Sequence, residues 1–411
     1  MDSIRKFYHD IIKVWANEIR LIFKDKGILI FLFLLPLAYP IVYALIYNPE
    51  LAREVPVAVV DECRSTQSRE LVRMMDASEN TQLAGYAADM QEARRMVAEK
   101  KAYGILLIDS HFSKNIARGE QAHVTLFCDM SLLVRYKSML TSLTDATMTL
   151  GGKIQVETIG RLGADGPKIP ATVRSTYVAL GNPEQGFATF LLPGILTLIV
   201  QQSLILAICM MGGAIYERRR RNGDIDPLDT VNSGAVCRLL GKSLAYIVIY
   251  IIPLLYLLLI VPAIFKYPQV GGFIDILLMS IPYMLSVTFL GMTLQVFVRE
   301  RESAFLVIVF TSIIFLFLSG ITWPLFDMDP FFRFLSGCCP STWAMQAFER
   351  INANGASIAD IGLEYQMLWL LSAVYFFLAL AVNKFSRYGM LYQLATGNTP
   401  DCIKFLKRNR P

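Results

Sequence analysis

The chain has 411 residues and a formal net charge of +5, and 54% of its residues are hydrophobic. Much of the basic excess lies beside long apolar runs, so the charge does not indicate a nucleic-acid partner. The runs themselves exclude an ordinary soluble protein, because segments such as GILIFLFLLPLAYPIVYALIY are apolar on every helical face rather than on one stripe.

Residues 1–26 come before the first of these runs and have a pattern of their own. Their apolar side chains recur at helical spacing, at Ile4, Phe7, Tyr8, Ile11, Trp15, Ile19 and Ile22. Basic side chains lie on the other side, at Lys6, Lys13, Arg20 and Lys24. This pattern predicts an amphipathic helix that lies along the cytoplasmic membrane interface, followed by a first span that stays in place as an uncleaved anchor.

Six apolar runs are each close to the roughly 20 residues that a helical bilayer crossing needs. We therefore predict a polytopic α-helical membrane protein with six transmembrane helices. Their predicted ranges are 27–47, 187–212, 244–265, 273–298, 304–323 and 363–383. A short tail, 384–411, follows the last span.

Residues 48–186, between the first two spans, are polar and long enough to form a core of their own. Apolar runs of strand length alternate there with segments of helical period. Strands are predicted at 55–61, 103–109 and 123–129, and helices at 68–78, 90–101 and about 131–159. The sequence thus predicts a mixed α/β domain.

This domain shows no catalytic or metal-binding pattern. The whole chain has three histidines, His9, His111 and His123, and no two of them have metal-ligand spacing. Cys63 and Cys128 both lie in the domain, beside strand-like runs. A disulfide between them and two packed free thiols both agree with that placement, and the sequence leaves the alternatives open.

Two polar residues, Gln201 and Gln202, lie midway along the second span, where polar side chains are costly unless they are paired or face a polar cavity. They are candidates for lining a substrate path. The alternative is that they form hydrogen bonds between helices, which needs no further function.

The loop 213–243, between the second and third spans, contains Gly241-Lys242-Ser243, which ends like a phosphate-binding P-loop. The earlier glycine of that motif is missing, because Val236 occupies its position, and no strand precedes it. We therefore predict that the chain does not bind ATP itself.

The segment 324–350 is apolar but is interrupted by prolines and glycine. Such a segment leaves unpaired backbone groups in lipid, so it has to pack within protein or line a cavity. We predict short re-entrant helices near 331–337 and 341–350, before the last span.

Orientation follows from the basic residues in short loops, which resist translocation. The N-terminal segment, the loop 213–243, the connection at Arg299 and Arg301, and the tail are basic, whereas the opposing connections are poorer in Lys and Arg. Both termini are therefore predicted to be cytoplasmic, and residues 48–186 to be extracytoplasmic, in a multi-pass cell membrane, the inner one in a cell with two membranes.

Ser319-Gly320, Pro324, Met328, Pro330, Pro340 and Arg350 resemble the signature of ABC exporter permeases of the second type. The interfacial helix and the large domain after the first span add to the resemblance, which covers nearly the whole chain. Together these features resemble the larger bacterial members of the family, such as multidrug-exporter permeases. The resemblance implies a membrane subunit that pairs with itself or with a related permease. It also implies a separate cytoplasmic ATPase that binds ATP and Mg.

The family carries a coupling helix for the ATPase between its second and third spans, which here implies roles for Glu217, Arg218, Arg219, Arg220, Arg221, Gly223 and Asp224. The four arginines depart from the family's acidic pattern, and binding to anionic lipid headgroups is the alternative for them. By the same resemblance, Ser319, Gly320, Pro324, Pro330, Pro340 and Arg350 form an outer gate.

The sequence therefore predicts a permease subunit that moves an apolar or amphipathic compound outward, powered by a separate ATPase. A periplasmic adaptor and membrane lipids are further partners expected of such a subunit. The alternative is a non-transporting membrane scaffold or receptor that acts through residues 48–186.

Overall fold

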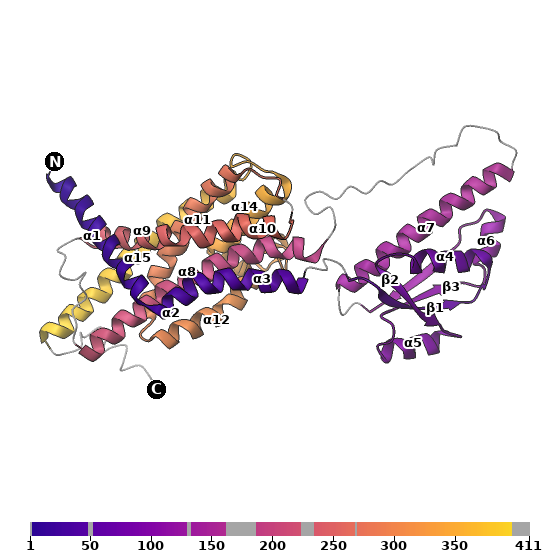
Figure 1. Cartoon of the computed structure of the whole chain (residues 1–411), viewed down its shortest axis with the longest axis horizontal. Coiled ribbons are helices and arrows are strands. Elements are labelled where there is room, and N and C mark those ends of the chain that lie inside the picture. Colours follow the sequence, from indigo (N-terminus) through magenta and orange to yellow (C-terminus); the bar gives the residue numbers. More distant parts are fainter. Residues whose placement is uncertain are drawn as a thin grey trace. The chain divides into compact units, whose positions relative to one another are not determined.

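The computed structural model describes residues 2–47, 52–129, 133–161, 186–222, 234–267 and 269–396. The chain divides into two compact units, and each is described here by itself. The larger unit contains the described residues before 48 and after 187, and the smaller one contains those within 52–161 together with 186 and 187. Figure 1 shows that the larger unit is a bundle of helices and that the smaller one is a sheet covered by helices.

The larger unit holds six helices that are long and apolar enough to cross a membrane, which confirms the prediction of about six spans. They run over Lys26–Ile46, Phe187–Arg218, Ala235–Ile264, Phe273–Phe297, Arg301–Leu318 and Gly362–Asn383. Their main helical segments are α3 (Leu35–Tyr47), α8 (Phe187–Asn222), α9 (Ala235–Leu255), α11 (Phe273–Leu294), α12 (Arg301–Leu318) and α15 (Gly362–Thr396).

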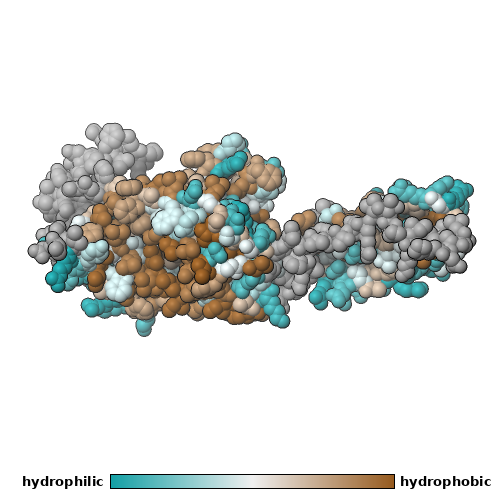
Figure 2. Space-filling model, turned by 90° about the horizontal axis from the view of Figure 1, so that it is seen from above, coloured by the Kyte–Doolittle hydropathy of each residue, from teal (hydrophilic) through white to brown (hydrophobic). Residues whose placement is uncertain are grey.

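Helix α8 is the centre of this bundle. In the most apolar stretch of α8, 94% of the residues are buried. In the most apolar stretch of α12, only 18% are buried. Side chains of α8, α9 and α11 form one continuous core, in which Tyr246, Tyr250 and Tyr283 are fully buried. The face of the unit that Figure 2 shows is largely hydrophobic, which suits contact with lipid.

The first and third spans each contain a wide π-helical turn, at Ile30–Leu34 and Tyr256–Ile260. Each turn ends just before a proline, and the residue preceding that proline donates its N–H to the carbonyl five residues back. Proline has no N–H and its ring crowds the carbonyl of the turn before it, so the helix widens there rather than breaking. The short α2 (Lys26–Leu29) precedes the first wide turn, and α10 (Val261–Ile264) follows the second.

Helix α1 (Asp2–Lys24) packs along α9. The two approach closely at Gly241, where a Cβ atom would lie 2.7 Å from the side chain of Val14. The predicted amphipathic helix therefore forms, and its buried side includes Val14, Glu18 and Ile22.

Between α12 and α15 lie the 3-10 turn η4 (Leu325–Asp327) and two helices, α13 (Pro330–Gly337) and α14 (Pro340–Asn354). Each helix has its proline at the first position, where a missing N–H has no cost. The predicted fifth span ends at Leu318 rather than 323, because Ser319 and Gly320 stop the helix. The Ser319 hydroxyl accepts from Ile321 N at 3.3 Å, and Gly320 has a φ of +90°.

The smaller unit is a four-stranded sheet in the order β2-β1-β3-β4. The strands are β1 (Val55–Asp61), β2 (Thr81–Tyr86), β3 (Gly104–Ile108) and β4 (Val124–Cys128). The first three are parallel, and β4 runs antiparallel to β3. One face packs against α4 (Thr66–Asp76), α6 (Phe112–Arg118) and α7 (Leu133–Arg161), and the other packs against α5 (Met90–Ala98).

Two elements of this unit were not predicted, β2 and α6. Strand β2 lies at an edge of the sheet, and its sequence, TQLAGY, lacks a continuous apolar run, so it gives little strand signal. Cys63 and Cys128 are free thiols in the structure, which agrees with the packed-thiol alternative rather than the disulfide.

Several segment ends also differ from the predicted ones. Helix α8 continues to Asn222 and α9 begins at Ala235, so both flanks of the predicted coupling loop 213–243 are helical. Helix α15 continues to Thr396, into the predicted tail 384–411. Residues 223–233 and 397–411 lie outside the described residues.

Candidate functional site

The strongest polar site of the helical unit lies where α1 ends. The chain leaves the helix at Asp25, which has an extended backbone and begins α2. The Asp25 carboxylate accepts from Ile28 N at 3.4 Å, so it caps the first turn of the first span. Because its side chain is only 10% exposed, the carboxylate needs a compensating charge.

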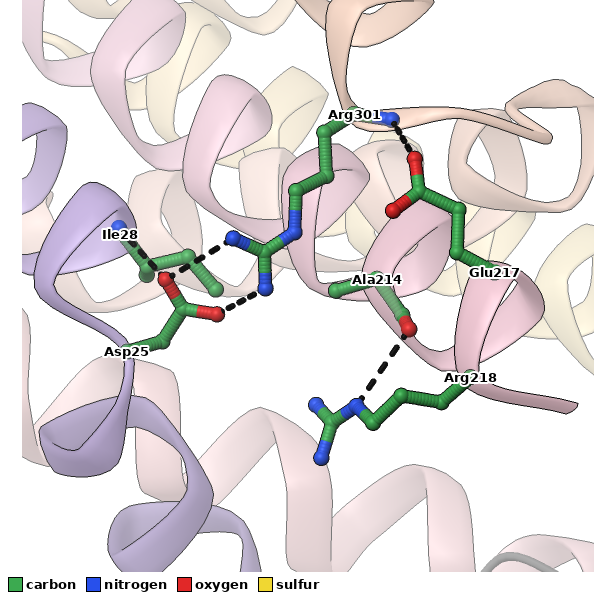
Figure 3. Close-up of polar contacts among 6 residues, drawn as sticks. All are labelled: Asp25, Ile28, Ala214, Glu217, Arg218 and Arg301. Carbon is green, nitrogen blue, oxygen red and sulfur yellow. Dashed lines mark hydrogen bonds and ion pairs between the residues drawn. The ribbon is translucent and has the colours of Figure 1, made fainter. Parts of the chain in front are cut away.

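Arg301, the first residue of α12, supplies that charge, as Figure 3 shows. Its two terminal nitrogens face the two Asp25 oxygens, and the Nη1 to Oδ1 distance is 3.3 Å. A guanidinium and a carboxylate in this two-point arrangement fix the relative orientation of the segments that carry them. The pair therefore joins the start of the first span to the start of the fifth.

Glu217, near the end of α8, completes the site from the other side of Arg301. Its Oε1 accepts from the Arg301 backbone N at 2.9 Å (Figure 3). A carboxylate at this place satisfies a free N–H at the start of α12 and suits the positive end of the helix dipole. We call Asp25, Glu217 and Arg301 the Arg301 junction.

The sequence allows this close approach through Gly213, one turn before Glu217 on α8. A Cβ atom at Gly213 would lie 2.9 Å from the Glu300 carbonyl carbon and 3.0 Å from Arg301 N. Both atoms belong to the backbone, so they cannot move aside as a flexible side chain would. Glycine is therefore required for α8 to meet the start of α12.

A second contact ties α1 to α9, about two helical turns before Asp25. Glu18 on α1 is 1% exposed and lies 3.7 Å from Lys242 Nζ. The hydroxyl of Tyr246, on the next turn of α9, donates to Glu18 Oε1 at 3.3 Å. Together with the close packing at Gly241, these contacts hold the amphipathic helix against the third span.

The coupling residues expected from the sequence separate into three groups. Glu217 takes part in the Arg301 junction. The Arg218 Nε donates to its own helix, to Ala214 O at 3.4 Å, and does not join the junction. Arg219, Arg220 and Arg221 lie in the last turn of α8, and the structure does not describe their side chains. Gly223 and Asp224 lie outside the described residues.

Asp25 was missed by sequence reasoning, and Arg301 was used only to assign orientation. The signal for Asp25 was a single acidic residue between Lys24 and Lys26, at the start of an apolar run. Its partner lies more than 270 residues away along the chain, so no local pattern indicates the pair.

The predicted outer-gate residues lie at different helix ends and turns of the segment between α12 and α15. Ser319 and Gly320 end α12, Pro324 precedes the 3-10 turn, and Pro330 and Pro340 begin α13 and α14. The Ser336 hydroxyl donates to the Leu318 carbonyl at 2.6 Å, so α13 is tied to the end of α12.

Arg350, near the end of α14, joins that helix to the start of α15. Its Nη1 lies 2.6 Å from Glu364 Oε1, and its Nη2 donates to the Asp360 carbonyl at 2.8 Å. Hydrogen bonds from the Ser357 side chain and backbone hold the pKa of Asp360 below its usual value. The connection between α14 and α15 is thus fixed by charged groups.

Substituting Arg350 with methionine is expected to destabilise the helical unit by about 2 kcal/mol, because the buried Glu364 loses its charge-assisted hydrogen bond. The double variant Arg350→Met with Glu364→Leu should recover most of that loss. Thermal unfolding in detergent measures both effects, with the exposed Arg333→Met as the control. Equal melting temperatures for Arg350→Met and the control would contradict this assignment.

Gln201 and Gln202 occupy different environments on α8. Gln201 is fully buried, and its Oε1 accepts from Ser341 N at 2.8 Å, so it caps the first turn of α14. The amide atoms of Gln202 are buried and have no hydrogen-bond partner among the described residues. Gln201 thus forms a hydrogen bond between helices, which is the alternative that the sequence left open. Gln202 remains the candidate for lining a substrate path.

The Gln201→Leu variant is expected to loosen the start of α14 and to cost about 1–2 kcal/mol, because the Ser341 N–H loses its acceptor. Gln202→Leu is the matched control, since it removes amide atoms that have no partner and should leave stability unchanged or raised. Hydrogen exchange at the amide of Ser341 measures the difference. Equal exchange in the two variants would show that Gln201 does not hold α14.

In the described part of the chain, one arginine joins the starts of two spans to the end of the central helix. The Arg301 junction thus ties together three segments that are far apart in the sequence.

Comparisons with known proteins identify the family of the chain. Residues 26–381 match the family described as ABC-2 family transporter protein. The chain is 24% identical over 294 residues to ABC transporter G family member 20 of Dictyostelium discoideum, covering 68% of this chain and 37% of that protein. It is 24% identical over 373 residues to the linearmycin resistance permease protein LnrN of Bacillus subtilis (strain 168), covering 85% of this chain and 93% of that protein. The chain therefore belongs to the ABC-2 family of transporter proteins.

Proposed function

We propose that this chain is the permease subunit of an ATP-driven exporter, powered by a separate ABC ATPase that binds ATP and Mg. Both termini are cytoplasmic in this proposal, α1 lies along the membrane interface, the smaller unit is extracytoplasmic, and α13 and α14 are re-entrant. The basic loops support the orientation, and the prolines that begin α13 and α14 support the re-entrant assignment.

The Arg301 junction is the observation that carries the proposal. It joins the break between α1 and α2, the end of α8 and the start of α12, all of which the basic residues assign to the cytoplasmic side. An ATPase that binds the loop after α8 pushes on Glu217 during its cycle. Because Glu217 holds the start of α12, that movement tilts the fifth span and the amphipathic helix together.

The cargo is apolar or amphipathic: a drug-like compound, a lipid or a lipid-linked compound. The linearmycin resistance in the name of the Bacillus relative supports efflux of a toxic compound. The weakly buried α12 suits a dimer with a second copy or with a related permease, and the extracytoplasmic unit suits contact with an adaptor.

Affinity purification of the chain from its native cells in mild detergent, followed by mass spectrometry, tests the partnership. An ABC ATPase should co-purify, and its rate of ATP hydrolysis should change when the permease is removed. Consistent recovery without any ATPase, together with a ligand of the smaller unit, would support the scaffold alternative instead.

A further inference from the structure

The first span has two unlike faces. Its packed face is a stripe at four-residue intervals, formed by Ile28, Leu32, Pro36, Pro40 and Ala44, all buried. The opposite face is the stripe Ile30, Leu34, Ala38 and Val42, all exposed. Within the described residues, no other helix covers that second stripe.

The exposed stripe is hollowed rather than flat. Residues from Ile30 to Val42 line a hollow of about 240 Å³ whose walls are entirely apolar. Ala38, whose side chain is small, is one of the residues that line it, together with larger neighbours such as Leu34 and Tyr39. At a rise of 1.5 Å per residue, the helix from Ile30 to Val42 extends over roughly 18 Å. This length is slightly more than half the thickness of a bilayer core.

The hollow is open and entirely apolar, and it lies on a face of the span that no other described helix covers. A single flexible hydrocarbon chain is thin enough to follow such a hollow along its length. The hollow therefore suits an acyl chain, and a charge at its end favours a lipid over the apolar side of a partner helix.

A positive charge lies at one end of the same stripe. Lys26 comes four residues before Ile30, so it extends the stripe by one turn. Its side chain is exposed, and it forms no ion pair within the described part of the chain. The neighbouring carboxylate of Asp25 is occupied by Arg301 and does not neutralise it. A lysine at the end of a span reaches the headgroup region, where it attracts anionic lipid.

We propose that this face of the first span is a binding site for one anionic phospholipid of the surrounding bilayer. An acyl chain fills the hollow at Ala38, and the phosphate lies against the ammonium group of Lys26. The headgroup then lies next to Asp25, so the lipid borders the Arg301 junction. The site depends on insertion in a membrane and not on an ATPase partner.

Native mass spectrometry of the full chain, released from nanodiscs of phosphatidylglycerol or of phosphatidylcholine, tests the proposal. The chain should retain phosphatidylglycerol about fivefold more strongly, the factor that one basic side chain near a charged membrane surface contributes. Lys26→Gln should abolish that preference, and Ala38→Phe should reduce the retention of both lipids by filling the hollow. The controls are Lys13→Gln, an exposed lysine of α1, and Ala373→Phe, an exposed alanine of α15.

Three results would overturn the proposal. The first is equal retention of the two lipids by the unchanged chain. The second is unchanged retention in Lys26→Gln and Ala38→Phe. The third is efficient crosslinking of two copies through Ala38→Cys in the membrane, because a second protein then occupies the hollow. Melting temperatures near that of the unchanged chain for both lipid-site variants separate a lost site from a lost fold.

Discussion

Replacing Gly213 with valine is expected to separate α8 from the start of α12 and to abolish coupled transport. The first side-chain atom alone would lie 2.9 Å from the backbone of Glu300, where no rotamer change can relieve the contact. Overpacking of this kind costs about 3 kcal/mol, and here it also breaks the hydrogen bond from Arg301 N to Glu217. Thermal unfolding in detergent and the ratio of transport to ATP hydrolysis measure the two effects.

Gly152→Val is the matched control for this variant, because Gly152 also lies in a helix, and no atom lies within 4 Å of its added Cβ. The control should melt at the temperature of the unchanged chain or slightly above it, since valine favours the helix more than glycine does. If Gly213→Val were as stable and as active as the control, α8 would not depend on close contact with α12.

The second large effect is expected at Arg301. Arg301→Met leaves the Asp25 carboxylate without its charge partner, although the hydrogen bond to Ile28 N remains. The expected loss is about 1–3 kcal/mol, below that of a fully buried pair, because the arginine side chain is 37% exposed. Transport should fall more than ATP hydrolysis, since the ATPase still turns over while α12 no longer follows α1.

A double-mutant cycle isolates the interaction from other effects of the substitutions. Arg301→Met, Asp25→Asn and the double variant are compared, with the exposed Arg299→Met as the control. Partners in contact should give a coupling energy of about 0.5–3 kcal/mol in melting experiments. Additive losses would mean that the two residues act independently, and the junction would then not be a mechanical link.

The fold could be predicted where the signal is local and strong. Six long apolar runs indicate six helices whatever their packing, and a buried strand such as VPVAVVD is recognisable from its composition. The helices near 331–337 and 341–350 could be placed because prolines and a glycine interrupt the apolar segment around them. In the structure each helix begins at one of those prolines, which is a local preference of the first helical position.

The remaining features depend on contacts between distant segments. Strand β2 is stabilised by pairing with β1 rather than by its own sequence. Predicting the π-helical turns requires both the position of a proline and the packing of the helices around it. The ends of spans two and six continue as helices into charged sequence, where hydropathy no longer marks the boundary.

The residues of the candidate site divide in the same way, into those that a local pattern indicates and those that only contacts between distant segments reveal. Glu217 was found because its loop has a recognisable place in the chain order, but its partner is a backbone N–H, which no sequence pattern identifies. Asp25 and Arg301 meet only because α8 brings α12 beside the first span, and Gly213 is what permits that approach. The role of Gln201 likewise required the position of α14.

The most direct test of the account is ATP-driven movement of labelled amphiphiles, and of linearmycin, by the purified chain and its co-purified ATPase in proteoliposomes. The account predicts movement that requires ATP, stops with a hydrolysis-deficient ATPase and is lost in Arg301→Met while ATP hydrolysis continues. ATP hydrolysis at the same rate with and without the chain, with no movement of any compound, would contradict it.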